Sequence, residues 1–552
     1  MRKHYPMNRI QEIFLFLLAT SLFQACGEEK QKNETRTSFR YNQHNPITSL
    51  DPAFARTQNN IWAVDCLFNG LVQLDDQLLV QPCLAKSWSI SPDGLTYRFL
   101  LRQDVFFHDD PAFVPDGKGR KMVASDVVYS FERLLDETWP KPGSWIFKGR
   151  VAKDSAFTAE NDSIFVLRLS SPFQPMLQIL TMQYASIVPH EVCSYWGREF
   201  RRHPVGTGPF RFKVWVENQA LVLLKNERYF EKDSSGAPLP YLDAIRVSFI
   251  TDRKTAFLEF KKGRLDYFFG LESAYIHELL TQDGTIQPNL ADEIQFTKNP
   301  YLNTEYLGIK MSEFAHNGAS ITPLQFKKVR QALNYGLDRA QMLRVLRNQV
   351  GKPADAGFAP RGLPSYAPHE VQGYTYRPEK AAALLAEVGF PKGKNLPVIT
   401  LLCNNEYLDI CTFITRQWED LGIQVRIELQ ETALLRERMR NGQAPFFRAS
   451  WIADYPDAES FLTCFYSKNG TPPNYTQFKN PLYDQYYEAA LAETDQSKRF
   501  KLYRQMDQIL IEEAPVVFLF YDETAQFSRR NISGLPGNAI NLLSLKKVRK
   551  SN

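Results

Sequence analysis

The sequence predicts an α/β fold with more than one domain, and three observations support this prediction. The chain has 552 residues, which exceeds the size at which a single hydrophobic core stops growing. Its hydrophobic content of 44% and charged content of 23% are typical of a folded globular protein. After Pro323, apolar strand patterns alternate with amphipathic helix patterns, and this alternation builds a parallel sheet.

The first 40 residues are typical of an export signal followed by a tether. Residues 1–25 combine a basic start, an apolar run and a small residue at the end. The apolar run is too short to cross a bilayer as a helix, which needs about 20 residues. The Ala25-Cys26 pair resembles a bacterial lipoprotein processing site, with Cys26 lipidated and 26–40 a flexible tether. A cleaved signal with an incidental cysteine is the alternative, and it implies the same export.

Four elements are predicted in the first part of the chain. Residues 87–102 predict a β-hairpin, because apolar residues alternate on either side of a Pro-Asp-Gly turn. Residues 124–135 predict an amphipathic helix capped by Ser125 or Asp126. The other two elements are a helix that ends near Gly70 and a strand within 204–215.

The second part of the chain contains the alternating strands and helices. Strands are predicted at 396–403, 423–429 and 445–453, and helices at 326–337, 378–389, 408–422 and 431–442, with Asp338 capping the helix after 337. In open parallel sheets, ligands bind beyond the carboxyl ends of the strands. Asp454 follows the last of these strands, where an unpaired buried carboxylate requires a cationic partner.

Composition and motifs argue against catalysis and against nucleic-acid binding. A formal charge of +5, from 66 basic and 61 acidic residues, gives no electrostatic case for nucleic acid. The sequence contains no HExxH, GxSxG or GxxxxGK[ST] motif. His108-Asp109-Asp110 could ligate a metal, but a solvated hairpin end is the favoured interpretation. We therefore expect no enzyme activity, no metal and no cofactor.

Six cysteines follow Cys26, and none of them forms a CxxC pair. Most lie within apolar stretches, so buried thiols are favoured over disulfides, although an exported protein could pair some of them. The six are Cys66, Cys83, Cys193, Cys403, Cys411 and Cys464.

Ordered blocks along nearly the whole mature chain resemble the extracellular solute-binding proteins of peptide ABC importers, the oligopeptide- and dipeptide-binding family (solute-binding family 5). These blocks include FNGL (68–71), LAKSWSISPDGLTYRFLLR (84–102), PVGTGPF (204–210), FKKGRLDYF (260–268) and WIADYPD (451–457). The resemblance implies a two-lobed periplasmic-binding-protein type II fold, with an extra inserted subdomain and a hinge that lets the lobes close. It divides the chain into lobe 1 (41–69, 205–296 and 516–552), the inserted subdomain of lobe 1 (70–204) and lobe 2 (297–515).

The resemblance also implies a ligand site between the lobes. In peptide-binding members the acid of the WxADY segment meets the α-amino group of the ligand, and Asp454 occupies that position. Arg448, six residues earlier, would lie near the carboxylate or backbone of the ligand. The strand segment Ser450, Trp451 and Ile452 would pair with the ligand main chain, as would the segment that contains Arg56 and Thr57, and Tyr306 would line the cleft from lobe 2.

Each assignment has a structural alternative. Asp454 could cap its own turn, Arg448 could form an internal salt bridge, and Trp451 and Tyr306 could belong to the core. Arg56 stands where an oligopeptide-binding relative has an acid, so it favours an acidic or carboxylate-bearing ligand or points into solvent. Asp457 and Glu459 are expected to be solvated or to cap a helix.

Three functions are compatible with the sequence. The first is a lipid-anchored, monomeric peptide-binding protein of the cell envelope, facing the periplasm or the extracellular space. It would deliver short peptides to ABC permease subunits that work with separate ATPase subunits. The second keeps the fold but binds a nickel chelate, an oligosaccharide or another small solute. The third is a hydrolase or an envelope chaperone on the same scaffold, which the missing catalytic motifs disfavour.

Overall fold

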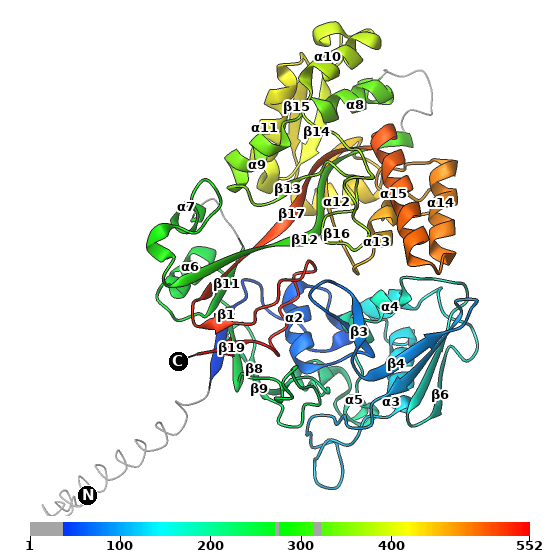
Figure 1. Ribbon diagram of the computed structural model, residues 1–552, viewed down its shortest axis with the longest axis vertical. Helices are drawn as coiled ribbons and strands as arrows, with labels where there is room; N and C mark the ends of the chain where they lie inside the picture. The colour runs from blue at the N-terminus through cyan, green and yellow to red at the C-terminus, as the bar shows by residue number, and fades with distance from the viewer. Residues whose placement is uncertain (1–36, 271–274, 313–321, 552) are drawn as a thin grey trace, which may run out of the picture.

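The computed structural model describes residues 37–270, 275–312 and 322–551. The predicted signal, most of the tether and Cys26 lie outside the described residues. Across those three ranges, none of the helices combines the length and apolar character that a membrane span requires. Figure 1 shows a lower part, built mainly from the early residues, and an upper part built from the later ones.

One 11-stranded sheet runs through both parts of the molecule. Its order is β15 (Val425–Leu429), β14 (Ile399–Cys403), β16 (Phe446–Ile452), β12 (Ile294–Ile309), β17 (Val516–Arg529), β11 (Tyr267–Phe269), β1 (Ser38–Asn42), β10 (Ala244–Ser248), β9 (Ala220–Lys225) and β8 (Phe210–Val216), with the short β13 (Lys352–Pro353) paired to β17. The predicted strands at 396–403, 423–429 and 445–453 are β14, β15 and β16. β14 pairs with both β15 and β16 in parallel.

Two long strands connect the two parts of the molecule. β12 and β17 are antiparallel partners over most of their length, and both cross from the lower to the upper part in Figure 1. Their register shifts between Pro300 and Thr304 and again between Glu305 and Tyr306. A β-bulge bends a strand locally and increases its twist, so the sheet changes direction where it passes from one part to the other.

Helices cover both faces of the sheet in the upper part. The first group is α8 (Lys327–Tyr335), α9 (Arg339–Arg347), α10 (Pro378–Glu387) and α11 (Leu408–Glu419), which share a core with Leu401, Cys403 and Phe446. The second group is α12 (Thr432–Arg440), α13 (Glu459–Leu462), α14 (Pro481–Ala492) and α15 (Gln496–Glu513), which share a core with Phe447 and Ala449. Successive residues of a strand point to opposite faces, so Phe446 and Phe447 belong to different cores.

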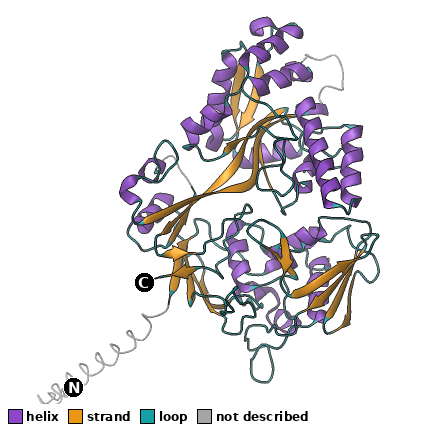
Figure 2. Cartoon of the chain, in the orientation of Figure 1, coloured by secondary structure: helices purple, strands orange, loops and turns teal. Residues whose placement is uncertain are grey.

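The lower part combines the other end of the large sheet with smaller units. A four-stranded antiparallel sheet has the order β4 (Ala85–Ile90), β5 (Thr96–Leu101), β7 (Ile164–Arg168) and β6 (Phe157–Asn161). Two small hairpins pair β2 (Val72–Leu74) with β3 (Val80–Pro82), and β18 (Ile532–Ser533) with β19 (Arg549–Lys550). The helices are α2 (Gln58–Leu67), α3 (Ala124–Leu135), α4 (Met176–Ile179), α5 (His190–Trp196), α6 (Arg253–Lys261) and α7 (Ile276–Leu279). Figure 2 shows most of these strands and short helices below the crossing strands, whereas α6 and α7 lie at the left, beside the lower end of β12.

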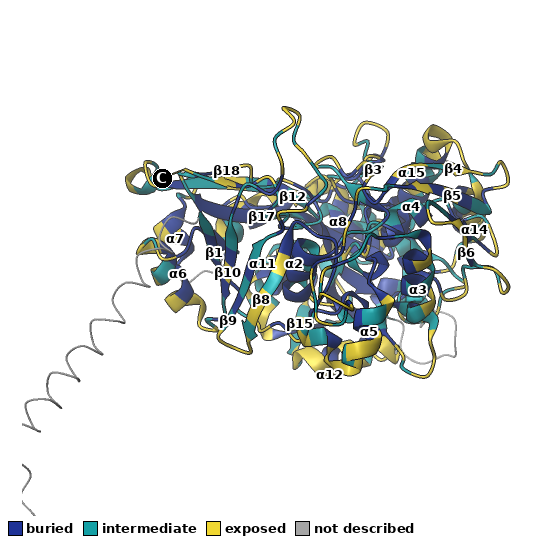
Figure 3. Ribbon diagram, turned by 90° about the horizontal axis from the view of Figure 1, so that it is seen from below, coloured by how far each residue is buried: buried dark blue, intermediate teal, exposed yellow. Residues whose placement is uncertain are grey.

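Buried contacts join the lower part to the upper part. Leu78, in the β2–β3 turn, is buried in the same core cluster as Phe461 and Tyr483 of the upper part. Tyr455 of the upper part is buried in the core cluster of the lower part. The Gln174 backbone N–H also donates to the Leu491 carbonyl oxygen across the same boundary, at 3.3 Å. Figure 3 shows buried segments concentrated along the strands, whereas α12 carries exposed residues.

Three local predictions were tested directly by the structure. The helix at 124–135 forms, but its N-cap is Val123 and not Ser125 or Asp126. Asp126, inside the first turn, accepts from the Val123 backbone N–H. His108 is 4% exposed and not solvated, since its Nε2 lies 3.0 Å from the Gly208 carbonyl oxygen. The six predicted thiols are buried and free, as expected.

Candidate functional site

The C-terminal half of β16 has one backbone edge without a strand partner. β12 pairs with β16 along the whole length of β16, from Ile309↔Phe446 to Asn303↔Ile452. On the opposite edge, β14 pairs with β16 only at Leu402↔Phe447. β14 ends at Cys403, so it does not reach the second half of β16.

The backbone groups of Ser450 and Ile452 face this unpaired edge. The Ala453 N–H donates to the Leu302 carbonyl oxygen at 2.9 Å, and the Pro445 carbonyl oxygen accepts from Lys310 at 2.9 Å. Residues opposite each other in an antiparallel pair alternate between exchanging and not exchanging hydrogen bonds. The odd-numbered residues of β16 therefore bond to β12, and the backbone N–H and C=O groups of Ser450 and Ile452 point the other way.

Asp454 follows this strand directly, and its side chain is exposed. Its backbone N–H donates to Ser460 Oγ at 3.0 Å, but its carboxylate has no hydrogen bond or ion pair with any residue of the described ranges. The protein around the carboxylate desolvates it and raises its pKa to about 6, while the positive charge of Arg150 acts in the opposite direction. The ionised form of a carboxylate that is desolvated but not paired is stabilised when a cation binds beside it.

The turn at Asp454 is held by other groups, which argues against a purely structural role for its carboxylate. The Trp451 indole Nε1–H donates to the Ser460 carbonyl oxygen at 2.6 Å. Asp457 Oδ1 accepts from the Glu459 backbone N–H at 2.9 Å. The Asp457 backbone N–H, which an Asp454 cap would bond, donates instead to the Tyr455 carbonyl oxygen at 2.8 Å.

Asp457 and Glu459 are buried, contrary to the expectation that they would be solvated. Each is 4% exposed. The hydroxyls of Tyr455 and Tyr487 donate to the two carboxylate oxygens of Glu459, and Asp457 lies 3.7 Å from Arg499. These contacts compensate both carboxylates, and the predicted capping role of Asp457 is present at the Glu459 N–H.

The lower part of the molecule meets the Asp454 segment through aromatic and cationic side chains. The Trp145 and Tyr455 rings stack with centroids 6.4 Å apart. Arg150 Nη1 donates to the Trp145 carbonyl oxygen at 2.6 Å, which keeps the guanidinium group beside this stack. Burial raises the pKa of the Tyr184 hydroxyl, while the charge of Arg56 lowers this pKa and the charge of Asp454 raises it.

Arg56 and Thr57 lie on the same side of the site as Tyr184. Both residues are exposed, and Thr57 is the N-cap residue of α2. The Gln183 side chain donates to the Ala55 carbonyl oxygen at 2.7 Å, which anchors this segment next to Tyr184. The structure therefore places the Arg56 segment against the turn that contains Tyr184, whose hydroxyl is also affected by the charge of Asp454.

Arg448 and Tyr306 occupy positions that differ from the predicted ones. Arg448 is 8% exposed, forms a buried ion pair with Glu305 and lies over the Tyr407 ring. Tyr306 is 2% exposed and packs against Phe358 at a ring-centroid distance of 5.0 Å. The internal salt bridge and the core packing, which were the structural alternatives, describe these two residues. The reason is that Glu305 would otherwise be an unpaired charge in the core.

Four residues of the site were missed in the sequence. Trp145, Arg150 and Tyr184 lie in the stretch 70–204, which is predicted to be an insert, and Tyr455 is the residue after Asp454. The sequence gives no signal for the first three, because nothing in a local pattern tells which side of the inserted stretch meets lobe 2. Tyr455 could have been chosen from its place within the WIADYPD block.

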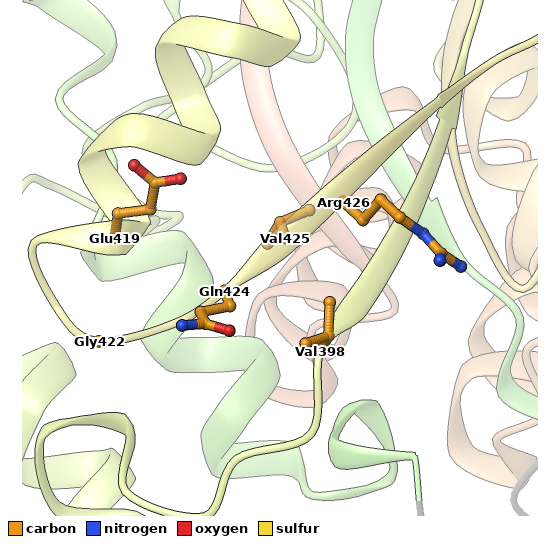
Figure 4. Close-up of a pocket in the computed structure, with 6 residues that line it drawn as sticks. All are labelled: Val398, Glu419, Gly422, Gln424, Val425 and Arg426. Atoms are coloured by element: carbon orange, nitrogen blue, oxygen red, sulfur yellow. The ribbon is translucent and has the colours of Figure 1, made fainter.

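One pocket of the upper part lies at the outer edge of the sheet, between the end of α11 and the β14–β15 pair (Figure 4). Its volume is about 370 Å³, and it is lined by Val398, Glu419, Gly422, Gln424, Val425 and Arg426. These residues belong to the edge formed by β14 and β15, whereas Asp454 follows β16. Val398 is 56% exposed, and we assign the ligand site to Asp454 and not to this pocket.

Comparisons with known proteins agree with this architecture. Heme-binding protein A of Haemophilus influenzae is 29% identical over 455 residues, which cover 79% of this chain and 78% of that protein. The dipeptide-binding protein of Escherichia coli is 26% identical over 490 residues, covering 85% of this chain and 86% of that protein. The structure of the periplasmic binding protein DppA of Helicobacter pylori in complex with the peptide STSA has a TM-score of 0.73 at 24% identity. It covers 94% of this chain and 100% of that one.

The family assignment rests on a match over most of the chain. The family model for bacterial extracellular solute-binding proteins, family 5, matches residues 80–473. This range includes most of the stretch 70–204 that is predicted to be an insert, the crossing strand β12 and the Asp454 segment. The fold is the two-lobed type II fold of periplasmic binding proteins, as its structural neighbours have it. The chain belongs to family 5 of the bacterial extracellular solute-binding proteins.

Proposed function

We propose that this protein captures short peptides with a free amino terminus, as the solute-binding component of an ABC importer. The observation that carries this proposal is the unpaired, desolvated carboxylate of Asp454 at the end of a strand whose outer backbone edge is free. The peptide-binding relatives support it, since the dipeptide-binding protein of Escherichia coli shares 26% of its aligned residues with this chain.

The Asp454 carboxylate matches the ammonium group of a peptide, and the free edge of β16 matches its main chain. A free ammonium gives Asp454 a charge-assisted hydrogen bond, worth about 1.5–3 kcal/mol net. An extended ligand main chain can pair with the free edge at Ser450 and Ile452, as in β-augmentation. This pairing satisfies backbone groups whatever the side chains are, so peptides of varied sequence can bind.

Closure of the two lobes completes the site in this proposal. Asp454 belongs to lobe 2, whereas Arg150, Trp145 and Arg56 belong to lobe 1 and its insert. A ligand that touches both sides favours the closed form by the free energy of those extra contacts. The hinge would be the β12–β17 crossing, with lobe 1 comprising 41–69, 205–296 and 516–552, the insert 70–204 and lobe 2 297–515.

The cellular setting is part of the same proposal. Residues 1–25 would be removed on export, Cys26 would carry the lipid anchor, and the monomer would face the periplasm or the extracellular space. The closed form would be recognised by the permease subunits, with ATP hydrolysis supplied by separate subunits. The binding protein itself would then perform no bond-making chemistry.

Peptide titration by isothermal calorimetry tests the proposal on the protein lacking residues 1–25. A tripeptide with a free amino terminus should bind, and its N-acetylated form should bind about 30-fold more weakly, because the ammonium–carboxylate pair is lost. Asp454→Asn should weaken the free tripeptide by a similar factor. The matched control is Asp420→Asn, which neutralises an exposed carboxylate at the end of α11 and should change nothing. Equal affinity for the free and acetylated peptides would refute the role of Asp454.

A further inference from the structure

Arg56 and Arg150 are not neutralised by carboxylates of the protein. Within the described residues, neither guanidinium group forms an ion pair. Other arginines near the site do have such partners: Arg133 pairs with Asp51, Arg448 with Glu305 and Arg499 with Asp457. Two positive charges therefore remain uncompensated on the side of the site that faces Asp454.

Arg150 is held in place by neutral contacts. Its Nη1 donates to the Trp145 carbonyl oxygen at 2.6 Å, and its guanidinium lies over the Phe173 ring, 5.0 Å from the centroid. Trp145 in turn stacks on Tyr455, which follows Asp454. Because these contacts leave the charge itself unpaired, Arg150 can still bind an anion that enters next to Asp454.

Arg56 is held by a different segment of the chain from Arg150. It follows Ala55, whose carbonyl oxygen is bonded to the Gln183 side chain at 2.7 Å, and its own side chain is exposed. Tyr184, next to Gln183, lies within the electrostatic reach of both Arg56 and Asp454. The turn Pro52–Phe54, which precedes Arg56, contacts both the turn that contains Tyr184 and the turn that contains Trp145. The Arg56 segment therefore packs against the part of the molecule that meets Tyr455.

The charge count of this site exceeds what a neutral peptide can satisfy. One carboxylate, Asp454, matches the ligand's ammonium, and the ligand's own carboxylate can match one guanidinium group. The second guanidinium would then have no carboxylate to pair with. An additional carboxylate on the ligand would remove this imbalance, and arginine binds carboxylates with a favourable two-pronged geometry.

We infer that Arg56 and Arg150 form an anion subsite opposite Asp454, which selects peptides that carry an acidic side chain next to a free amino terminus. This inference rests on the proposed function, since it specifies which peptides the same site prefers. Arg448 does not contribute, because its charge is already paired with Glu305 in the core.

The test compares Ala-Glu-Ala, Ala-Gln-Ala and Ala-Lys-Ala by calorimetry on the protein lacking residues 1–25. The parent should bind the Glu peptide about tenfold more tightly than the Gln peptide, and the Lys peptide most weakly. In the Arg56→Gln/Arg150→Gln variant the ratio of the Glu and Gln affinities should fall to about one. The control Arg344→Gln removes an exposed charge on α9 and should keep the ratio near ten. The parent's ratio should also fall as salt is added.

Three results would overturn the inference. Equal affinities for the Glu and Gln peptides in the parent would remove it and leave the proposed function intact. A preference for Glu that survives in the double variant would show that other groups read the acid. Binding of none of the three peptides would refute the proposed function together with the inference.

Discussion

Asp454 and Glu459 lie five residues apart in one segment, but their carboxylates differ in exposure and in hydrogen bonding. Glu459 is 4% exposed, and two tyrosine hydroxyls donate to its oxygens. Asp454 is exposed and its carboxylate accepts no hydrogen bond within the described part of the chain. Desolvation raises the pKa of both groups, to about 6 for Asp454.

The difference separates a carboxylate that maintains the fold from one that is available to a ligand. Buried polar groups are normally hydrogen-bonded, since an unsatisfied one costs about 1–3 kcal/mol. Glu459 obeys this rule through Tyr455 and Tyr487. Asp454 is exposed, so this rule does not require a protein partner for it. Desolvation nevertheless raises its pKa, and it follows a strand whose outer edge is free in the described ranges. A carboxylate with a perturbed pKa beside such an edge is a candidate for ligand binding.

Glu459→Ala gives the largest expected effect and tests the structural half of the comparison. Two buried tyrosine hydroxyls would lose their acceptor, so the free energy of unfolding should fall by about 3 kcal/mol. Urea denaturation followed by fluorescence measures this change. Glu459→Gln keeps one acceptor oxygen and should lose less. If Glu459→Ala is as stable as Asp454→Ala, the two carboxylates do not differ in the way described.

The pH dependence of peptide affinity tests the other half. An ammonium ligand needs an ionised Asp454, whose pKa is raised to about 6 in the free protein. Affinity should therefore be highest near pH 7 and fall by about tenfold between pH 7 and pH 5. Calorimetry at several pH values gives the profile, and Asp454→Asn should flatten it. A parent profile that stays level down to pH 5 would mean that the carboxylate has an ordinary pKa.

Trp145→Ala gives the smallest expected effect and sharpens the comparison from the opposite lobe. The Trp145–Tyr455 stack contributes about 0.5–1.5 kcal/mol beyond its buried area, and it forms only when the lobes meet. Peptide affinity should fall about fivefold, whereas Trp145→Phe should retain most of it. Stronger binding by Trp145→Ala would indicate that the stack holds the site shut against the ligand.

Local pattern alone was sufficient for much of lobe 2. Short apolar runs that alternate with helical patterns predicted the strands β14, β15 and β16 and the helices α11 and α12 between them. The position of Asp454 at a strand end followed from the same pattern. The choice of Asp454 as the ligand-binding acid came from the family resemblance, and the measurements proposed above test it.

The partners of the charged residues were decided by the tertiary structure. Arg448 and Glu305 are 143 positions apart in the sequence, and their pairing depends on the register between β12 and β16. Trp145 and Arg150 reach Asp454 only because the inserted stretch lies against lobe 2. Whether a charged residue has an ion-pair partner depends on such distant neighbours. The apolar periods of 2 and 3.6 residues describe only which face of a strand or helix a residue occupies. The sequence therefore determined which elements form and where Asp454 stands, and the packing of the lobes decided that its carboxylate, Arg56 and Arg150 remain free.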